Sequence, residues 1–387
     1  MSRDEGVGDE NRSKVRLSHR LFRPNILPLA LIAANVLCFL AAGRIFDFPV
    51  RLSLYAGKAL FVLAPVSVIL ALCAACLITL FRNRPDRPTA FLRDKLMLDW
   101  KLLERAARGL PLLLCMTLMF SAFTSYKAAI SKIVPFYADP YAVSLDLMIH
   151  GTDPWRLLQP FIGFPVVTEA INFFYNLWFF VMYAALSLGV FMLVDERLRS
   201  QYLAAFILSW SLIGGLAATL FSSAGPCYYS AFYAGDPFAE LFAYLDHAKN
   251  IYPVVARNVQ AMLLEKYKLN QMGLGAGISA IPSMHIAVVV LNGIFLSKIN
   301  RLAGWAAWIF AVIIFVGSVH LGWHYAVDGY AAALLVVIIW FAAGKLVDWS
   351  EFVKKMPRKA GEKSITYGIP AATSALIDTP DVMAKVY

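Results

Sequence analysis

Long apolar runs alternate with shorter polar segments along the whole chain. An apolar run of about 18 to 25 residues is long enough to cross a hydrocarbon core of about 30 Å as an α-helix. The sequence contains eight such runs, of which the sixth is the shortest because it closes at Lys298. The pattern therefore predicts an all-α fold, a polytopic membrane helical bundle of about eight transmembrane helices. The expected spans are residues 25–43, 57–81, 109–126, 171–194, 202–222, 284–299, 302–319 and 325–347.

The composition supports a membrane protein and excludes an ordinary soluble one. Of the 387 residues, 60% are hydrophobic and only 16% are charged, whereas soluble domains carry about 25% charged residues. The formal net charge of +10 comes largely from Lys and Arg in polar segments, where such residues set topology and meet anionic head groups. We therefore expect a membrane-embedded protein without a nucleic-acid partner.

Lys and Arg gather in three polar segments, and cytoplasmic loops carry that excess in membrane proteins. We predict a cytoplasmic tail at 1–24, two N-terminal spans with a basic cytoplasmic loop at 25–108, a six-helix core at 109–347 and a second cytoplasmic tail at 348–387. The remaining polar segments then face the extracytoplasmic side. The absence of long loops suited to glycosylation favours a bacterial inner (plasma) membrane.

Two of the extracytoplasmic segments have helical patterns of their own. Residues 137–160 mix aromatic and acidic residues around two prolines, which is typical of short helices in the membrane interface. Such helices would form either a lid over a head group or an anchoring belt. Residues 236–270 have the pattern of a solvated helical hairpin, and its cations, among them Arg257 and Lys268, are candidates to bind phosphate.

A cluster of ionisable residues interrupts the apolar sequence before the last span. His320, His324 and Asp328 are spaced i, i+4, i+8, so they would share one face if the last helix extended back. Asp328 is then placed to accept the Nδ1 proton of His324, which leaves Nε2 as a base, nucleophile or ligand. A metal site of two histidines and one carboxylate is disfavoured, because Asp328 cannot both orient His324 and serve as a good ligand beside it. His320 is either solvated or supporting.

A second histidine belongs to the start of the sixth span. Pro282 discourages helix before it and Ser283 is a good N-cap, so His285 should lie in the first helical turn. The predicted topology puts His285 on the same side of the membrane as His324. Two helix N-termini would then offer free N–H groups to one place, which favours a phosphate.

These segments resemble the signature motifs of a known family. Pro282–His285 (PSMH) and His324–Asp328 (HYAVD) resemble the second and third motifs of the type 2 phosphatidic acid phosphatase superfamily. The His-Tyr-x-x-Asp form is most similar to its inositol phosphorylceramide synthase-like (inositolphosphotransferase) branch. Phe221–Tyr229 (FSSAGPCYY) resembles the first motif of that branch. The resemblance covers residues 110–347 and implies a core of six helices.

The resemblance also implies a phosphohistidine mechanism that needs no metal and no cofactor. His324 would attack phosphorus, Asp328 would orient it, and His285 would protonate the leaving oxygen and later take a proton from the acceptor. Further residues are candidates to bind the substrate through the motifs or from the neighbouring loop. They are Pro282, Ser283, Ser318, His320, Tyr228, Tyr325, Arg257 and Lys268.

The chain departs from the phosphatase pattern in its cations. The phosphatases carry a Lys and an Arg in the first motif and an Arg before the third, whereas here the first motif has no cation and Ser318 holds the last position. A phosphate monoester carries close to two negative charges and a phosphodiester carries one. The loss of cations therefore favours a diester donor.

The leading interpretation is a membrane phosphotransferase that moves an inositol phosphate-like head group from a phospholipid to a lipid alcohol at the extracytoplasmic leaflet. One alternative is a lipid phosphatase acting on a phospholipid, an isoprenoid diphosphate or a lipid A phosphate. Another is a transporter or scaffold whose histidines relay protons, which would place charges near the midplane of several spans. The sequence leaves the donor, the acceptor and the oligomeric state open.

Overall fold

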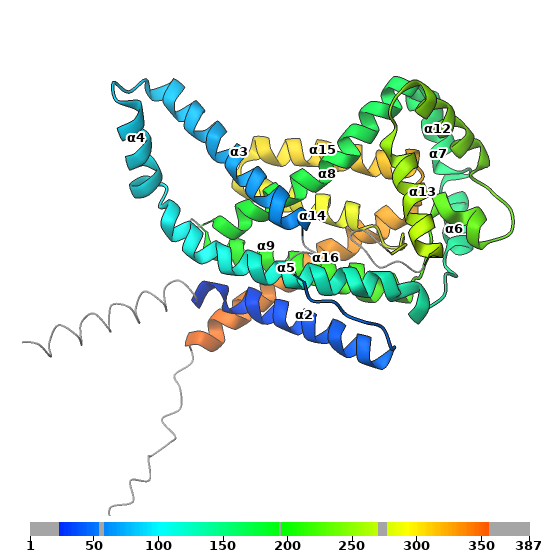
Figure 1. The fold of residues 1–387 in the computed structure, drawn as a ribbon, viewed down its shortest axis with the longest axis horizontal. Coiled ribbons are helices and arrows are strands. Elements are labelled where there is room, and N and C mark those ends of the chain that lie inside the picture. Colours follow the sequence, from blue (N-terminus) through cyan, green and yellow to red (C-terminus); the bar gives the residue numbers. More distant parts are fainter. Residues whose placement is uncertain (1–22, 54–57, 193–194, 270–276, 356–387) are drawn as a thin grey trace, which may run out of the picture. The chain divides into compact units, whose positions relative to one another are not determined.

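The computed structural model describes residues 23–53, 58–192, 195–269 and 277–355, and the described part contains helices and no strand (Figure 1). The predicted terminal tails lie largely outside these residues. The longer helices are α2 (Ile26–Ile45), α3 (Lys58–Asn83), α5 (Leu102–Ile133), α8 (Pro165–Phe191), α9 (Glu196–Ser211), α14 (Met284–Ile299), α15 (Arg301–His320) and α16 (Ala326–Lys355), and shorter ones are α4 (Pro88–Asp94), α6 (Asp139–His150), α7 (Pro154–Ile162), α12 (Ala239–Ile251) and α13 (Val255–Lys268).

Seven of the described helical segments are long and apolar enough to cross a membrane. One of them runs without a break from α9 through the π-helical turn η3 (Leu212–Ala217) and the short α10 (Ala218–Leu220). The eighth predicted span is α14, an apolar helix of 16 residues. The prediction of an all-α polytopic membrane bundle is therefore confirmed. The third span is longer than expected, because α5 continues past residue 126 and includes Lys127.

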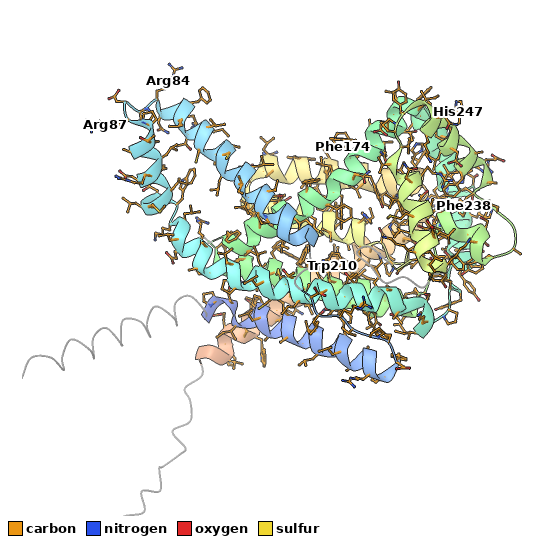
Figure 2. All side chains as sticks on the ribbon, in the orientation of Figure 1. Arg84, Arg87, Phe174, Trp210, Phe238 and His247 are labelled. Carbon is orange, nitrogen blue, oxygen red and sulfur yellow. The ribbon has the colours of Figure 1, made fainter. Side chains whose placement is uncertain are left out.

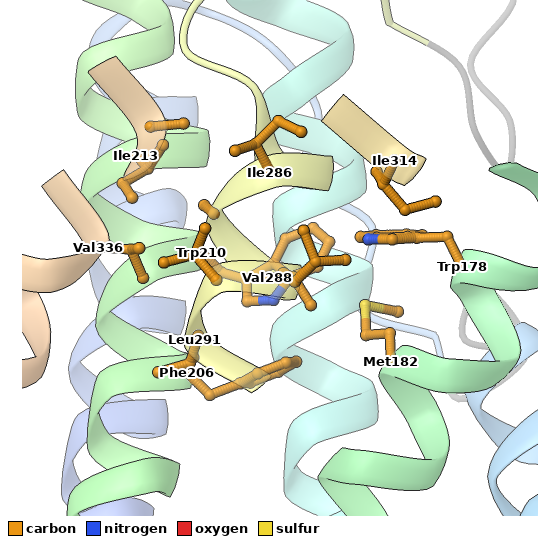
Figure 3. Close-up of a cluster of buried hydrophobic side chains, with 14 of the residues drawn as sticks. Trp178, Met182, Phe206, Trp210, Ile213, Ile286, Val288, Leu291, Ile314 and Val336 are labelled. Atoms are coloured by element: carbon orange, nitrogen blue, oxygen red, sulfur yellow. The ribbon is translucent and has the colours of Figure 1, made fainter. Parts of the chain in front are cut away.

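The short helix α14 is buried among its neighbours. Its contacts with α8, α9 and α15 explain why so apolar a helix needs no polar face. Figure 3 shows α14 side chains surrounded by residues from α8, α9, α15 and α16. The labelled members of this hydrophobic cluster are Ile286, Val288 and Leu291 of α14 with Trp178, Met182, Phe206, Trp210, Ile213, Ile314 and Val336.

The two N-terminal spans pack on the outside of the core, α2 against α5 and α9, and α3 against α8. Arginines join helices where α5 and α9 begin. Arg108 contacts Glu196 at 2.5 Å, and the fully buried Arg199 donates to the carbonyl of Val190 and to Asn25. Cations of the end predicted to be cytoplasmic thus also hold helices together.

Short helices gather at the other end of the bundle, where α6, α7, α12 and α13 lie (Figure 1). Figure 2 labels Phe238 and His247 there, and it labels Arg84 and Arg87 in the link between α3 and α4. The short helices expected in 137–160 are α6 and α7, each with a proline in its first turn, a position that suits proline. The hairpin expected in 236–270 is α12 and α13.

The last helix does not extend back as the spacing of its ionisable residues suggested. Helix α15 ends at His320, residues 321–325 form a turn, and α16 begins at Ala326. Gly322 has φ +70 within this turn, a backbone conformation that ends a helix and favours glycine. His320, His324 and Asp328 therefore do not share one helical face, and that expectation was wrong.

Candidate active site

Two histidines from different motifs face each other at this end of the bundle. His285 lies in the first turn of α14, where the Ser283 side chain caps the helix by accepting from the Ile286 amide at 3.4 Å. His324 lies in the turn before α16, and the two ring centroids are 5.7 Å apart. The helix start predicted from Pro282 and Ser283 is confirmed, and it places the His285 ring beside the His324 ring.

His324 is oriented by the carboxylate predicted to be its partner. Its Nδ1 lies 3.4 Å from Oδ2 of Asp328, and the Asp328 side chain is fully buried. The same oxygen accepts a 3.1 Å hydrogen bond from the amide of Tyr325. The contact with His324 is longer than a charge-assisted hydrogen bond of about 2.8 Å, and such contacts often tighten when substrate binds. Because Nδ1 faces the carboxylate, Nε2 is the nitrogen left for chemistry.

Aromatic side chains of α8 surround His285. The Tyr175 ring stacks on it with centroids 4.7 Å apart and an angle of 25° between the rings, and the Trp178 ring lies at 4.4 Å. The Trp178 indole also donates to the carbonyl of His285 at 3.1 Å. These contacts fix the position of the imidazole.

Asp139, at the start of α6, organises the first motif. This fully buried carboxylate accepts hydrogen bonds of 2.7 to 2.9 Å from five groups, two of them backbone amides of the motif. The sequence interpretation treated Asp139 as a polar residue of an interface helix and missed this role. The donors are the side chains of Ser223, Tyr233 and Tyr325 and the amides of Ala224 and Gly225.

Asp146, two turns further along α6, caps the last helix. Its two oxygens accept from the amides of Ala326 and Val327 at 2.9 and 3.0 Å. Burial raises the pKa of this carboxyl, while the two amides act in the opposite direction. The first amides of α16 are thus already occupied, so the expectation that two helix N-termini offer free N–H groups to a phosphate was wrong for α16.

A cavity of about 350 Å³ opens beside the histidines. His285 and His324 lie on its wall, and most of the remaining lining is aromatic or aliphatic. The lining comes from α5, α8, the segment α9 to α10, residues 224–228, α13, residues 277–285 and residues 323–324. A space of this kind fits a molecule with a polar group at the histidines and an apolar body, as expected of a lipid.

Several residues predicted to bind substrate have different places in the structure. Pro282 and Tyr228 line the cavity with the two histidines, whereas the hydroxyl of Ser318 donates to the carbonyl of Phe315 at 2.7 Å. The carbonyl of Ser318 accepts from the His324 amide at 3.1 Å, so Ser318 supports the turn through its backbone. Tyr325 donates to Asp139, as described above, and Ser283 is the helix cap.

His320 belongs to a separate polar contact. Its Nε2 lies 2.9 Å from the Thr168 hydroxyl, and its side chain is fully buried outside the cavity lining. Within the ranges that the structure describes, no group of three His, Cys, Asp or Glu residues is arranged to hold a metal ion. His320, His324 and Asp328, which were considered as a metal site from their spacing, are accordingly not arranged as metal ligands.

The cations predicted to bind phosphate do not line the cavity. Arg257 forms a two-pronged ion pair with Asp246 at 2.7 and 2.9 Å, and its guanidinium holds the pKa of that carboxyl below its ordinary value. Lys268 is exposed at the end of α13. Among the described lining residues, Lys127 of α5 is the one Lys or Arg. Sequence reasoning missed it because the third span was expected to end at 126, although a lone Lys in an apolar run was a signal.

Comparison with known proteins assigns the family. The family model described as PAP2 superfamily matches residues 143–342, which run from within α6 to within α16 and contain both histidines and Asp328. No curated protein and no solved structure matched the chain. The matched segment covers more than half of the 387 residues. The chain therefore belongs to the PAP2 superfamily, whose members act as lipid phosphatases or related phosphotransferases.

Proposed function

We propose that this protein is a lipid phosphotransferase that moves a phospho-head group from a phospholipid to a lipid alcohol through a phosphohistidine at His324. The observation that carries the proposal is the facing pair of His285 and His324 at one cavity with a largely apolar lining. The pair supplies a nucleophile and a proton donor within reach of one phosphorus atom. The lining suits the hydrocarbon part of the donor.

In the first half of the reaction, Nε2 of His324 attacks phosphorus. A P–N bond forms while the bond from phosphorus to the donor's glycerol oxygen breaks, and protonated His285 gives its proton to that oxygen. Asp328 faces Nδ1 of His324, so it stabilises the positive charge that develops on the imidazole. The first product is a neutral lipid alcohol that leaves through the apolar part of the cavity.

In the second half, the hydroxyl of the acceptor attacks the phosphohistidine. Neutral His285 takes the proton of that hydroxyl, an O–P bond forms, and the P–N bond to His324 breaks. His285 is again protonated and His324 is again free, so the cycle closes without loss of atoms or charge. Water in place of the alcohol would give hydrolysis by the same steps.

Transfer is favoured over hydrolysis by the lining of the cavity. Aromatic and aliphatic side chains such as Phe179, Met182 and Trp210 line its wall. An apolar wall favours the binding of a lipid alcohol over the binding of water. The scarcity of cations at the site fits a phosphodiester donor, as the inositolphosphotransferase-like motif form suggests. We place the reaction at the extracytoplasmic leaflet of the membrane, with both termini cytoplasmic, because basic residues of the link between α3 and α4, such as Arg84 and Arg87, lie at the opposite end from α6, α7, α12 and α13 (Figures 1 and 2).

The test is a reconstitution assay with two phospholipids. Protein in vesicles is given phosphatidylinositol with a lipid alcohol, or phosphatidic acid, each with and without a metal chelator. We expect head-group transfer from phosphatidylinositol, little phosphate release from phosphatidic acid, and loss of both in His324→Ala. His247→Ala is the matched control, because His247 is exposed on α12. Phosphate release without transfer would identify a lipid phosphatase. Turnover by His324→Ala at the native rate would rule out a phosphohistidine at His324.

A further inference from the structure

Lys127 lies at one end of a cavity-lining stripe on α5. Phe120, Phe123, Thr124 and Lys127 all line the cavity, and their spacing of i, i+3, i+4 and i+7 places them on one face of the helix. The first two are hydrophobic and the last is charged. The stripe thus passes from an apolar end to a cationic end along the wall of the same cavity that contains the two histidines.

The ammonium group of Lys127 has no protein counterion in the described part of the chain. No hydrogen bond or ion pair joins it to a described side chain, and no Asp or Glu is among the described residues that line the cavity. Ionised side chains within membrane-spanning helices normally pair with another group or mark a substrate pathway. A lysine without a protein partner therefore points to an anionic ligand.

The backbone places Lys127 beside the second motif. Gly277 has φ +99, and a Cβ built on it would lie 2.8 Å from the carbonyl carbon and oxygen of Lys127. Only glycine therefore lets this segment lie so close to α5. The same segment continues to Ala280, whose amide donates to Ser223 of the first motif at 3.1 Å, and then to His285.

Four buried polar atoms of cavity-lining residues have no hydrogen-bond partner among the described residues. They are the hydroxyl of Tyr175, the indole N–H groups of Trp210 and Trp323, and Nδ1 of His324, which faces Asp328. Among them, the side chains of Tyr175 and Trp323 form a pair. Tyr175 is itself only 6% exposed. Their rings are parallel, with centroids 6.4 Å apart, and both residues line the cavity with Lys127. Buried donors of this kind are normally satisfied, so they point to the same missing ligand.

We propose that Lys127, with the hydroxyl of Tyr175 and the indole N–H of Trp323, forms the subsite that binds the phosphoryl oxygens of a singly charged phosphodiester lipid. The proposal rests on the proposed function, because it assigns the phosphate of that reaction a binding group. One cation matches the single charge of a diester, and the two neutral donors complete the hydrogen bonds of its oxygens. A monoester, with nearly two charges, is matched less well.

The test measures binding without catalysis. In the His324→Ala background, quenching of Trp fluorescence is recorded with short-chain phosphatidylglycerol as the diester, phosphatidic acid as the monoester and diacylglycerol as the neutral lipid. Lys127→Met should weaken phosphatidylglycerol binding about tenfold to hundredfold, the range for a hydrogen bond to a charged group. It should leave diacylglycerol binding within about twofold, and Lys127→Arg should retain most of the affinity. Lys132→Met is the control, because Lys132 is exposed on the same helix and outside the cavity lining.

A second readout separates a ligand-binding lysine from a structural one. Removing an unpaired, half-buried cation should raise the melting temperature of the ligand-free Lys127→Met protein, whereas removing a structural lysine would lower it. Lys127→Gln is tested in parallel in case Met disturbs the helix. Unchanged phosphatidylglycerol affinity, or equal losses for phosphatidylglycerol and diacylglycerol, would overturn the proposal. Since no turnover is measured, these results do not depend on whether His324 is the nucleophile.

Discussion

The hydroxyl of Tyr325 donates a 2.9 Å hydrogen bond to Oδ1 of Asp139, although the two residues are 186 positions apart in the chain. Tyr325 directly follows His324, and Asp139 holds the amides of Ala224 and Gly225. This single bond therefore connects the first motif to the turn that carries His324. It fixes the position of the imidazole from a helix that contributes no catalytic group.

Removing this hydroxyl should reduce activity more than removing another donor to the same carboxylate. Tyr325→Phe and Tyr233→Phe each delete one hydrogen bond to Asp139, of 2.9 and 2.8 Å. Each should lower the free energy of unfolding by about 1 to 3 kcal/mol. Only Tyr325→Phe should also lower kcat, because only Tyr325 is adjacent to His324. Thermal unfolding in detergent and steady-state kinetics measure the two effects, and equal kcat values for the two variants would show that the hydroxyl of Tyr325 does not position His324.

The local helix signals of the second motif were readable from the sequence, and the long-range contacts were not. Pro282 and Ser283 mark a helix start wherever they fold, so His285 was placed correctly. The role of Asp139 depends on donors about 85 to 186 residues away, which no local pattern contains. The chain reversal at Gly322 was missed because a spacing of four residues looks alike in a continuous helix and across a turn.

The roles of the cations also depend on long-range contacts that the local sequence does not contain. Arg257 was a reasonable phosphate ligand by its position in a hairpin predicted to be extracytoplasmic, but Asp246 on the neighbouring helix already binds it. Lys127 was overlooked because the third span was predicted to end at residue 126, directly before this lysine. Only the packing of α5 against Gly277 shows that this lysine stays inside the bundle, beside the cavity.

Replacement of His285 should reduce the rate of the first step less when the leaving group requires no proton. Glycerol oxygen is a poor leaving group without general acid, whereas p-nitrophenolate leaves unprotonated. His285→Asn should therefore lose roughly 10²- to 10⁴-fold of activity on a phospholipid. With a p-nitrophenyl phosphodiester it should still release about one p-nitrophenol per protein molecule in a burst, followed by slow turnover. Rapid-mixing absorbance records the burst. A first turnover slowed as much as the phospholipid reaction would mean that His285 does not act as the proton donor.

The wall of the cavity should select the length of the lipid chain. Met182 lines the cavity from α8 and is 2% exposed, so Met182→Phe should narrow the space available to the hydrocarbon. We expect kcat/KM to fall for a donor with long acyl chains and to change little for one with short chains. The variant should lose no more than about 1 to 3 kcal/mol of stability from overpacking. If long and short donors lost activity equally, the hydrocarbon would lie elsewhere.

The most direct measurement is to locate the covalent intermediate by mass spectrometry. His285→Asn protein is mixed with a p-nitrophenyl phosphodiester of the head group, which needs no general acid, in the absence of acceptor, quenched under conditions that preserve phosphoramidates, digested and sequenced. We predict a phospho-head group adduct on the imidazole of His324, absent from a His324→Ala sample. In the native protein the adduct should disappear when a lipid alcohol is added. An adduct on another residue, or head-group transfer by His324→Ala at the native rate, would contradict a phosphohistidine at His324.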